Sequence, residues 1–139
     1  MKPIVLDTNL VVSAFLQPRG TAAEALGIAL REFEVVMAEP TLAELADVLS
    51  RDKFDRYLDK PTRRALLRDY AEAARAVIVT ESVADCRDPR DNKFLELALA
   101  AGARLVISGD RRDLLSMSPW RGIEIVAVRA FVEEWRGWL

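Results

Sequence analysis

Four acidic residues stand where predicted strands give way to helices or loops, and together they could bind a divalent cation. Asp7 follows the apolar run PIVL, Glu44 lies in LAELADVL, Asp91 in RDPRDNKF and Asp110 in SGDRRD. Carboxylates brought together without a counter-ion repel one another and raise each other's pKa values. Such a cluster is therefore stable mainly around a metal ion, and oxygen ligands alone favour Mg²⁺ or Mn²⁺. Either ion can activate water next to a phosphodiester, so the chemistry indicated is phosphate chemistry.

The composition excludes several other kinds of chemistry. The chain of 139 residues contains no histidine and a single cysteine, Cys86. Serine–histidine triads, imidazole metal sites and zinc sites built on several thiolates are therefore excluded. We expect Cys86 to be a buried apolar side chain. The net charge of −2 gives no overall basic field, so a nucleic-acid partner does not follow from charge balance.

The length and hydrophobicity predict a single globular domain over residues 1–139. Hydrophobic residues make up 51% of the chain and charged residues 30%, which is typical of a folded protein. No apolar run approaches the roughly 20 residues that a membrane helix needs, so we expect no membrane partner. The start, Met1-Lys2-Pro3, leads directly into a strand without an apolar signal segment. These features predict a soluble cytoplasmic protein.

Strand and helix patterns alternate along the chain. Apolar, β-branched runs predict strands at 4–6, 33–38, 76–80, 105–108 and 123–128. Helical spacing of apolar residues predicts helices at 10–16, 21–32, 42–49, 66–74, 92–101 and 129–139, with a short helix and a turn ended by Pro61 within 51–61. This alternation predicts an α/β fold with a parallel sheet covered on both faces.

In an open α/β sheet, functional groups collect just beyond the carboxyl ends of the strands. Asp7 ends the first strand, and Glu44 lies in the first turns of the helix after the second. Asp91 opens the helix after the third strand, and Asp110 follows the fourth. We therefore expect all four carboxylates to lie on the same rim of the sheet.

Each acid also has a purely structural explanation. Thr41 and Glu44 have the Thr-x-x-Glu spacing of a capping box, which by itself would account for Glu44. Asp88 could be the N-cap of a helix that starts at Pro89, with Asp91 favoured by the helix dipole.

The other two acids differ in how easily they are explained. Asp110 could simply belong to a loop, and Asp113 could cap a short turn through LLSM. Asp7 is hardest to explain in this way, because capping the next helix does not require an acid at the inner end of a buried strand. The case for a site rests on the convergence of all four acids.

The ordered set of motifs closely resembles PIN-domain proteins, in particular bacterial toxin-like PIN ribonucleases related to the VapC toxins. The motifs are LDTN after the first strand, LAELADVL after the second, and RDPRDNKFLELALAAGARLVISGDRRDLL across the third and fourth acids. The match covers nearly the whole chain, although no single motif is specific. The resemblance implies a three-layer α/β/α fold with a central, mostly parallel five-stranded sheet. It also implies a Mg²⁺- or Mn²⁺-dependent endoribonuclease.

Carried over by position, the four acids of the family fall on Asp7, Glu44, Asp91 and Asp110, with the small polar residues Thr8, Asn9 and Ser108 beside them. GDRRDLL offers a second candidate for the fourth acid, Asp113. The implied mechanism has three aspartates holding the metal and Glu44 either ligating it or positioning the attacking water. Water then displaces the 3′ oxygen in line and leaves a 5′-phosphate.

Further positions concern the binding of RNA and protein partners. Arginines and a lysine on loops next to the acids could contact RNA phosphates or could be solvated loop charges; these are Arg87, Arg90, Lys93, Arg111 and Arg112. An apolar face on the terminal helix, with Phe131 and Trp135 four residues apart, could form a homodimer or contact a cognate antitoxin.

Two other functions remain open from the sequence. One is a haloacid-dehalogenase-like phosphohydrolase with Asp7 as nucleophile, since GDRRD imitates a later motif of that family. That family needs an aspartate two residues after the nucleophile, whereas Asn9 stands there. The other is a non-catalytic PIN-like module that binds RNA or protein. The complete set of acids argues against it, because clustered carboxylates without a use only destabilise a fold.

Overall fold

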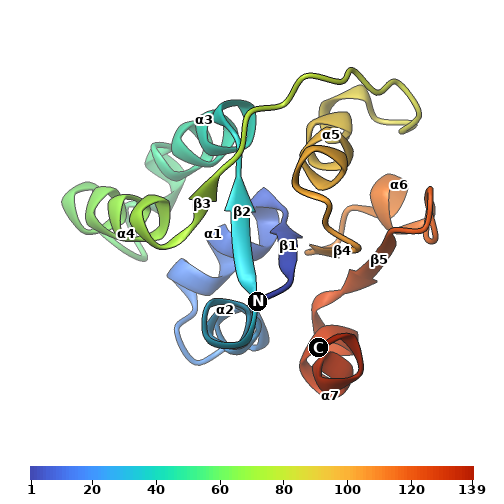
Figure 1. Cartoon of the computed structure of the whole chain (residues 1–139). Helices are drawn as coiled ribbons and strands as arrows, with labels where there is room; N and C mark the ends of the chain where they lie inside the picture. The colour runs from blue at the N-terminus through green and yellow to red at the C-terminus, as the bar shows by residue number, and fades with distance from the viewer.

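The sheet that positions the acids has five parallel strands in the order β3-β2-β1-β4-β5 (Figure 1). The computed structural model describes all residues from 1 to 139. The strands are β1 (Pro3–Leu6), β2 (Glu34–Met37), β3 (Arg75–Ala76), β4 (Leu105–Ser108) and β5 (Glu124–Ala127). The chain places β2 and β3 on one side of β1 and then crosses to β4 and β5 on the other. The expected α/β fold with a five-stranded sheet is confirmed, and every strand pair is parallel.

Helices cover both faces of the sheet (Figure 1). One face packs against α1 (Thr8–Leu16), α2 (Thr21–Glu32), α3 (Glu39–Leu49), α4 (Lys60–Ala73) and α7 (Val128–Glu134). The other face packs against α5 (Asn92–Ala101) and α6 (Arg112–Leu115). Single 3₁₀ turns occur at Asp52–Phe54, Pro89–Asp91 and Trp135–Trp138. No helix is long and apolar enough to cross a membrane.

The two cores follow from the alternation of side chains along the strands. In β1, Ile4 and Leu6 belong to the core under α1 and α2, whereas Val5 belongs to the core under α5. The β4 residues Ile107 and Val106 divide in the same way. Because both faces are buried, these strands have consecutive apolar residues, as expected for a parallel sheet. Cys86 is buried in the α5 core, as predicted.

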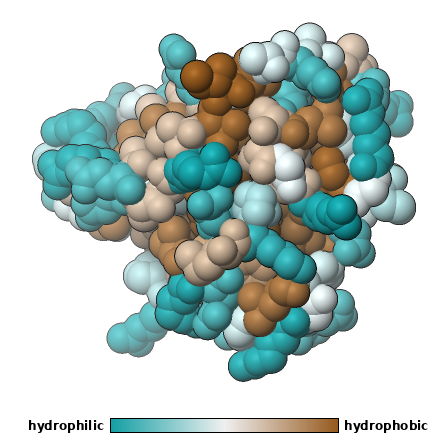
Figure 2. Space-filling model, in the orientation of Figure 1, coloured by the Kyte–Doolittle hydropathy of each residue, from teal (hydrophilic) through white to brown (hydrophobic).

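Several predicted boundaries were wrong. The strand expected at 76–80 pairs only over β3, because its partner β2 ends at Met37, whose carbonyl accepts the last hydrogen bond from Val77 N–H at 2.8 Å. The chain then leaves the sheet, and Ile78 is 87% exposed. Figure 2 shows hydrophobic atoms in small groups between hydrophilic ones on the face of the molecule seen in Figure 1. Pro61 lies in the first turn of α4 rather than ending a turn, since proline needs no hydrogen-bond acceptor there. The terminal helix changes to a 3₁₀ turn at Trp135.

Candidate functional site

Asp7 lies at the junction of β1, β4 and α1, and it is fully buried. Its Oδ1 accepts the N–H of Leu10 at 3.0 Å, so Asp7 does cap α1. The Ser108 hydroxyl donates to Oδ2 at 2.6 Å, and Gly109 N–H donates to both oxygens at 3.1 and 3.0 Å. Helix capping therefore explains only one of the hydrogen bonds to this carboxylate, because Ser108 and Gly109, at the end of β4, donate the others.

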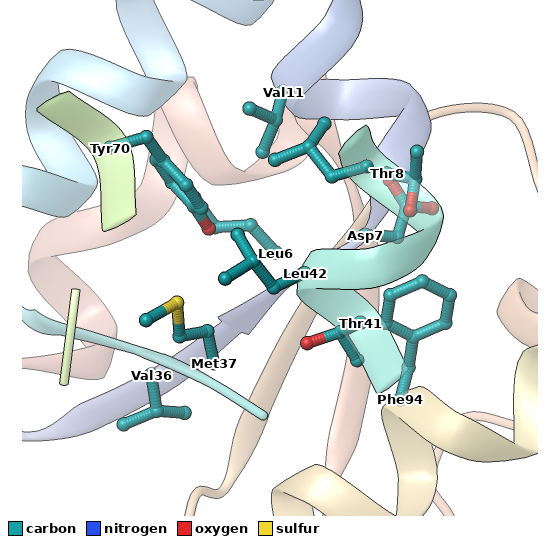
Figure 3. Close-up of a pocket in the computed structure, with 11 residues that line it drawn as sticks. Leu6, Asp7, Thr8, Val11, Val36, Met37, Thr41, Leu42, Tyr70 and Phe94 are labelled. Carbon is teal, nitrogen blue, oxygen red and sulfur yellow. The ribbon is translucent and has the colours of Figure 1, made fainter. Parts of the chain in front are cut away.

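Apolar side chains lie behind Asp7. Asp7 and Thr8 form one end of a small cavity whose other end is Tyr70, with Leu6 and Phe94 on its walls (Figure 3). Burial in these surroundings raises the pKa of Asp7 from its ordinary value, although the bonds from Ser108, Leu10 and Gly109 and the charge of Arg111 oppose the rise. Burial therefore disfavours the ionised form of Asp7 more than these bonds and the charge of Arg111 favour it.

Glu44 projects from α3 toward the same rim and does not form the capping box predicted for it. Helix α3 begins at Glu39, one turn earlier than the motif suggests, and Thr41 Oγ1 bonds with the N–H and carbonyl of Ala38 instead. Glu44 accepts hydrogen bonds from the Thr8 hydroxyl and from Lys93 Nζ, the latter at 3.0 Å. Burial opposes its ionisation, but these two bonds and the nearby cations lower its pKa.

Asp91 is buried at the end of the 3₁₀ turn that leads into α5. Asp88 caps this turn as predicted, since its carboxylate accepts Arg90 N–H at 3.0 Å. The next residue, Asn92, accepts Cys86 N–H at 2.8 Å and so fixes the incoming loop to the helix. The Asp91 carboxylate itself forms no capping hydrogen bond, and it accepts one from Arg111.

The guanidinium of Arg111 contacts all three of these carboxylates. Its Nη1 donates to Asp91, its Nη2 lies 3.4 Å from Glu44 Oε2, and its Nε lies 3.8 Å from Asp7 Oδ2. Burial disfavours the charged guanidinium, but the Asp91 bond and the charges of Glu44 and Asp7 outweigh it and raise the pKa of Arg111. Asp7, Glu44 and Asp91, which are far apart in the chain, thus meet around one cation.

Asp110 and Asp113 lie outside this cluster. Asp110 is exposed and has a positive φ of 66°, and Asp113 lies in the first turn of α6 rather than capping it. Neither carboxylate forms an ion pair. Both line the groove in front of the cluster, so each candidate for the fourth acid lies near the site but does not contact the other three acids.

The neighbouring polar residues mostly hold the acids in place. Thr8 and Ser108 are buried and donate to Glu44 and Asp7 respectively. Asn9 bridges the Gly109 carbonyl, at 3.1 Å, and Arg111 Nη2, at 3.4 Å. The sequence did not reveal that the Gly109 N–H is part of the site. A Cβ on Gly109 would lie 3.0 Å from Leu10 N, so this close approach requires glycine.

The five candidate phosphate-binding cations divide into two groups. Lys93 and Arg111 contact carboxylates of the cluster. Arg87, Arg90 and Arg112 are exposed, and Arg90 pairs with Asp88 at 2.9 Å. The acid cluster opens into a groove of about 840 Å³, whose cationic lining consists of Arg51, Lys53, Arg90, Arg111 and Arg112. This groove is the largest polar depression next to the acids.

The donor atoms of the cluster fit Mg²⁺ or Mn²⁺, because all are carboxylate or hydroxyl oxygens. The three acids are spaced around the Arg111 guanidinium, however, and no three acidic side chains converge closely enough to hold an ion. Asp7, Glu44 and Asp91 supply carboxylate oxygens of the kind that bind such an ion.

The chain belongs to the PIN-domain family, whose sequence signature matches residues 3–112. An uncharacterised protein of Methanocaldococcus jannaschii, MJ1680, is 29% identical over 116 residues, which are 82% of this chain and 74% of that protein. Members of the family are typically nucleases and generally use divalent metals.

Two solved structures of VapBC complexes share the fold. VapBC2 of Rickettsia felis, bound to a DNA fragment from its promoter, matches with a TM-score of 0.62 at 12% identity, over 90% of this chain and 98% of that one. DNA-bound VapBC of Salmonella typhimurium matches with a TM-score of 0.61 at 15% identity, over 92% and 99%. The predicted likeness to VapC toxins is thus confirmed at the level of the fold.

Proposed function

We propose that this protein is a Mg²⁺- or Mn²⁺-dependent endoribonuclease that hydrolyses RNA phosphodiester bonds. The observation that carries the proposal is the meeting of Asp7, Glu44 and Asp91 around a single cation at the carboxyl edge of the sheet. Three carboxylates in a partly buried place are unfavourable for stability, so a catalytic use accounts for them best. Membership of the PIN family supports the same conclusion.

Each residue of the site has a role in this proposal. Asp7, Glu44 and Asp91 hold the metal, with Asp110 as the fourth acid. A bound ion supplies the positive charge that activates water and polarises the phosphodiester. Ser108 and Gly109 orient Asp7, while Thr8 orients Glu44. Exposed arginines of the groove, such as Arg90 and Arg112, bind RNA phosphates on either side of the reacting bond.

The dehalogenase-like alternative is less consistent with the contacts of Asp7. A nucleophilic carboxylate needs one oxygen open to the substrate, whereas Asp7 is fully buried and both its oxygens accept hydrogen bonds. Asn9, at the place of the general acid, instead bonds with the Gly109 carbonyl. A non-catalytic module that binds RNA or protein is separated from the nuclease by the experiment below.

We further propose that the protein is the toxin of a toxin–antitoxin pair and that it forms a homodimer. The support for the toxin role is the shared fold with the VapBC complexes. Induced expression in a bacterial host should then arrest growth, and Asp7→Asn should abolish the arrest. Light scattering tests the dimer, and a monomer at high concentration contradicts it.

The deciding experiment incubates RNA with wild-type protein, Asp7→Asn and Asp69→Asn, each with Mn²⁺ or with chelator. Asp69 is a matched control because it is an exposed acid on α4, away from the groove. We expect Asp7→Asn to lower the cleavage rate about 100-fold or more, since the loss even of a group that only orients a metal ligand costs about 10–100-fold, and Asp69→Asn to leave it unchanged. Full activity of Asp7→Asn contradicts the proposal. A phosphorylated Asp7 without RNA cleavage supports the dehalogenase-like phosphohydrolase. RNA binding without cleavage supports the non-catalytic PIN-like module.

A further inference from the structure

Arg111 has the position and the charge of a counter-ion for the acid cluster. Each nitrogen of its guanidinium faces a different carboxylate, namely Asp91, Glu44 and Asp7. The side chain is only 16% exposed, so these charges interact with little screening by water. Its guanidinium carbon also lies 5.2 Å from the ring centroid of Phe94, which supports the cation from the side of the core.

Without a metal, the cluster needs this cation. Asp7 and Asp91 are both buried, and removing the only partner of a buried charge is strongly unfavourable. Lys93 supplies a second cation, but it contacts only Glu44. Arg111 is therefore the only basic side chain in contact with Asp7 and Asp91.

A metal ion and Arg111 compete for the same oxygen atoms. The atoms that would hold an ion include Asp91 Oδ1 and Asp7 Oδ2, which Arg111 contacts in this structure. A guanidinium and a divalent cation repel each other and cannot share so small a space. Binding of the ion thus requires Arg111 to leave.

The acids and the arginine are held very differently. Asp7 keeps its bonds from Ser108, Gly109 and Leu10 when Arg111 leaves, and Glu44 keeps those from Thr8 and Lys93. Arg111 instead follows Gly109 and the left-handed Asp110 on a loop, and it borders the open groove of about 840 Å³. The guanidinium therefore has room to move outward while the acids stay in place.

We propose that Arg111 is a built-in counter-ion that stabilises the metal-free acid cluster and that a divalent cation binds by displacing it. The inference rests on the metal-dependent site of the proposed function. It adds that the apparent metal affinity equals the intrinsic affinity multiplied by the fraction of molecules in which Arg111 has left the cluster. The protein thus stays folded without metal, at the expense of weaker metal binding.

The test titrates Mn²⁺ alone, without RNA, into wild-type protein, Arg111→Met and Arg112→Met by calorimetry. Methionine keeps most of the length of the side chain and removes its charge. Arg112, the first residue of α6, is the matched control, because it adjoins Arg111 but is exposed and forms no ion pair. We expect Arg111→Met to bind Mn²⁺ roughly tenfold more tightly than wild type, and Arg112→Met to bind it at most about twofold more tightly, because only a long-range repulsion is lost there.

Thermal melting adds a second readout. In chelator, Arg111→Met should melt about 5–10 °C below wild type, since the buried acids lose their cation. Saturating Mn²⁺ should reduce this difference, because the ion stabilises the variant more. Equal melting of both proteins in chelator, or Mn²⁺ binding to Arg111→Met no tighter than to wild type, overturns the proposal.

Labelling of the wild-type protein avoids any dependence on the folding of a variant. Phenylglyoxal modifies exposed arginines, and tandem mass spectrometry distinguishes Arg111 from Arg112. Mn²⁺ should speed the labelling of Arg111 and leave that of Arg112 unchanged. Labelling of Arg111 that does not respond to Mn²⁺ contradicts displacement. None of these measurements involves RNA, so a protein that exchanges Arg111 for Mn²⁺ but cleaves no RNA refutes only the proposed nuclease.

Discussion

The two most enclosed arginines of the molecule, Arg111 and Arg63, have opposite surroundings. Around Arg111 the acids Asp7 and Asp91 are buried, and the arginine is a loop residue at the edge of a groove. Arg63 is itself the buried partner: its side chain is 1% exposed, and its single ion pair, 2.5 Å long, is with Asp55, whose side chain is 47% exposed. The buried charge is thus acidic in one cluster and basic in the other.

This difference determines which group can be exchanged. Buried acids on strand and helix ends form a fixed anionic site, and their cation can be replaced by another cation from the solvent side. Arg63 is fixed in helix α4, and its Nε and Nη1 are buried without a hydrogen-bond partner. Its stem lies among Leu49, Leu67 and Ala46 at a cavity of about 120 Å³. Arg63 therefore acts mainly by packing between α3 and α4.

The largest effect that we expect separates packing from charge at Arg63. Arg63→Ala should lower the free energy of unfolding by about 2–4 kcal/mol, because it leaves a cavity in a close-packed region. Arg63→Met should stay within about 1 kcal/mol of wild type, because it keeps the volume and removes two unpaired donors while Asp55 returns to water. Urea denaturation measures both values.

The exposed neighbour Arg64 is the control for Arg63. It lies on the same turn of α4 and forms no ion pair, so Arg64→Ala should change the free energy of unfolding very little. If Arg63→Met is as destabilising as Arg63→Ala, the charge rather than the packing of Arg63 is essential, and the contrast with Arg111 disappears.

A smaller effect concerns the buried acid Asp7 and its dependence on pH. Because burial raises the pKa of Asp7 in the folded protein, the folded state holds this proton more tightly than the unfolded state. The wild-type protein therefore loses stability as pH rises from the ordinary aspartate value through the raised folded value. Asp7→Asn lacks this loss, so in chelator it should melt a few degrees above wild type at pH 7.

Melting curves at several pH values test this expectation. Near pH 4 the advantage of Asp7→Asn should disappear, because the wild-type carboxyl also holds a proton. Asp69→Asn, which changes an exposed acid, should follow the wild-type profile. An advantage that is independent of pH would mean that the ionisation of Asp7 is not its source.

The fold could be predicted from local patterns because both faces of the sheet are buried. Val35 and Val36, or Val106 and Ile107, enter opposite cores, so the central strands β2, β1 and β4 have consecutive apolar residues. The end of β3 could not be predicted in this way. Its length depends on where β2 stops at Met37, which the residues at 77–80 do not encode.

The site could be predicted only in part. The rule that strand ends meet on one rim correctly brought Asp7, Glu44 and Asp91 together. The local Thr41-x-x-Glu44 motif was misleading, because bonds from Thr8 and Lys93, distant in the chain, hold Glu44 elsewhere. The central place of Arg111 could not be foreseen, since two arginines adjoin and the backbone at Asp110 decides which one turns inward.

The smallest effect that we expect distinguishes Asp110 from Asp113, neither of which contacts the cluster. Asp110 adjoins Arg111, so a loop movement that withdraws the arginine can carry Asp110 toward the acids, whereas Asp113 is fixed in α6. Asp110→Asn should therefore weaken Mn²⁺ binding roughly tenfold, at the low end of the effect of losing a group that supports a metal site. Asp113→Asn should weaken it about twofold, through long-range attraction alone. Calorimetry on both variants shows which substitution weakens Mn²⁺ binding more. A larger loss for Asp113→Asn would assign Asp113 as the fourth acid, and the movement of Arg111 would then not be coupled to that of Asp110.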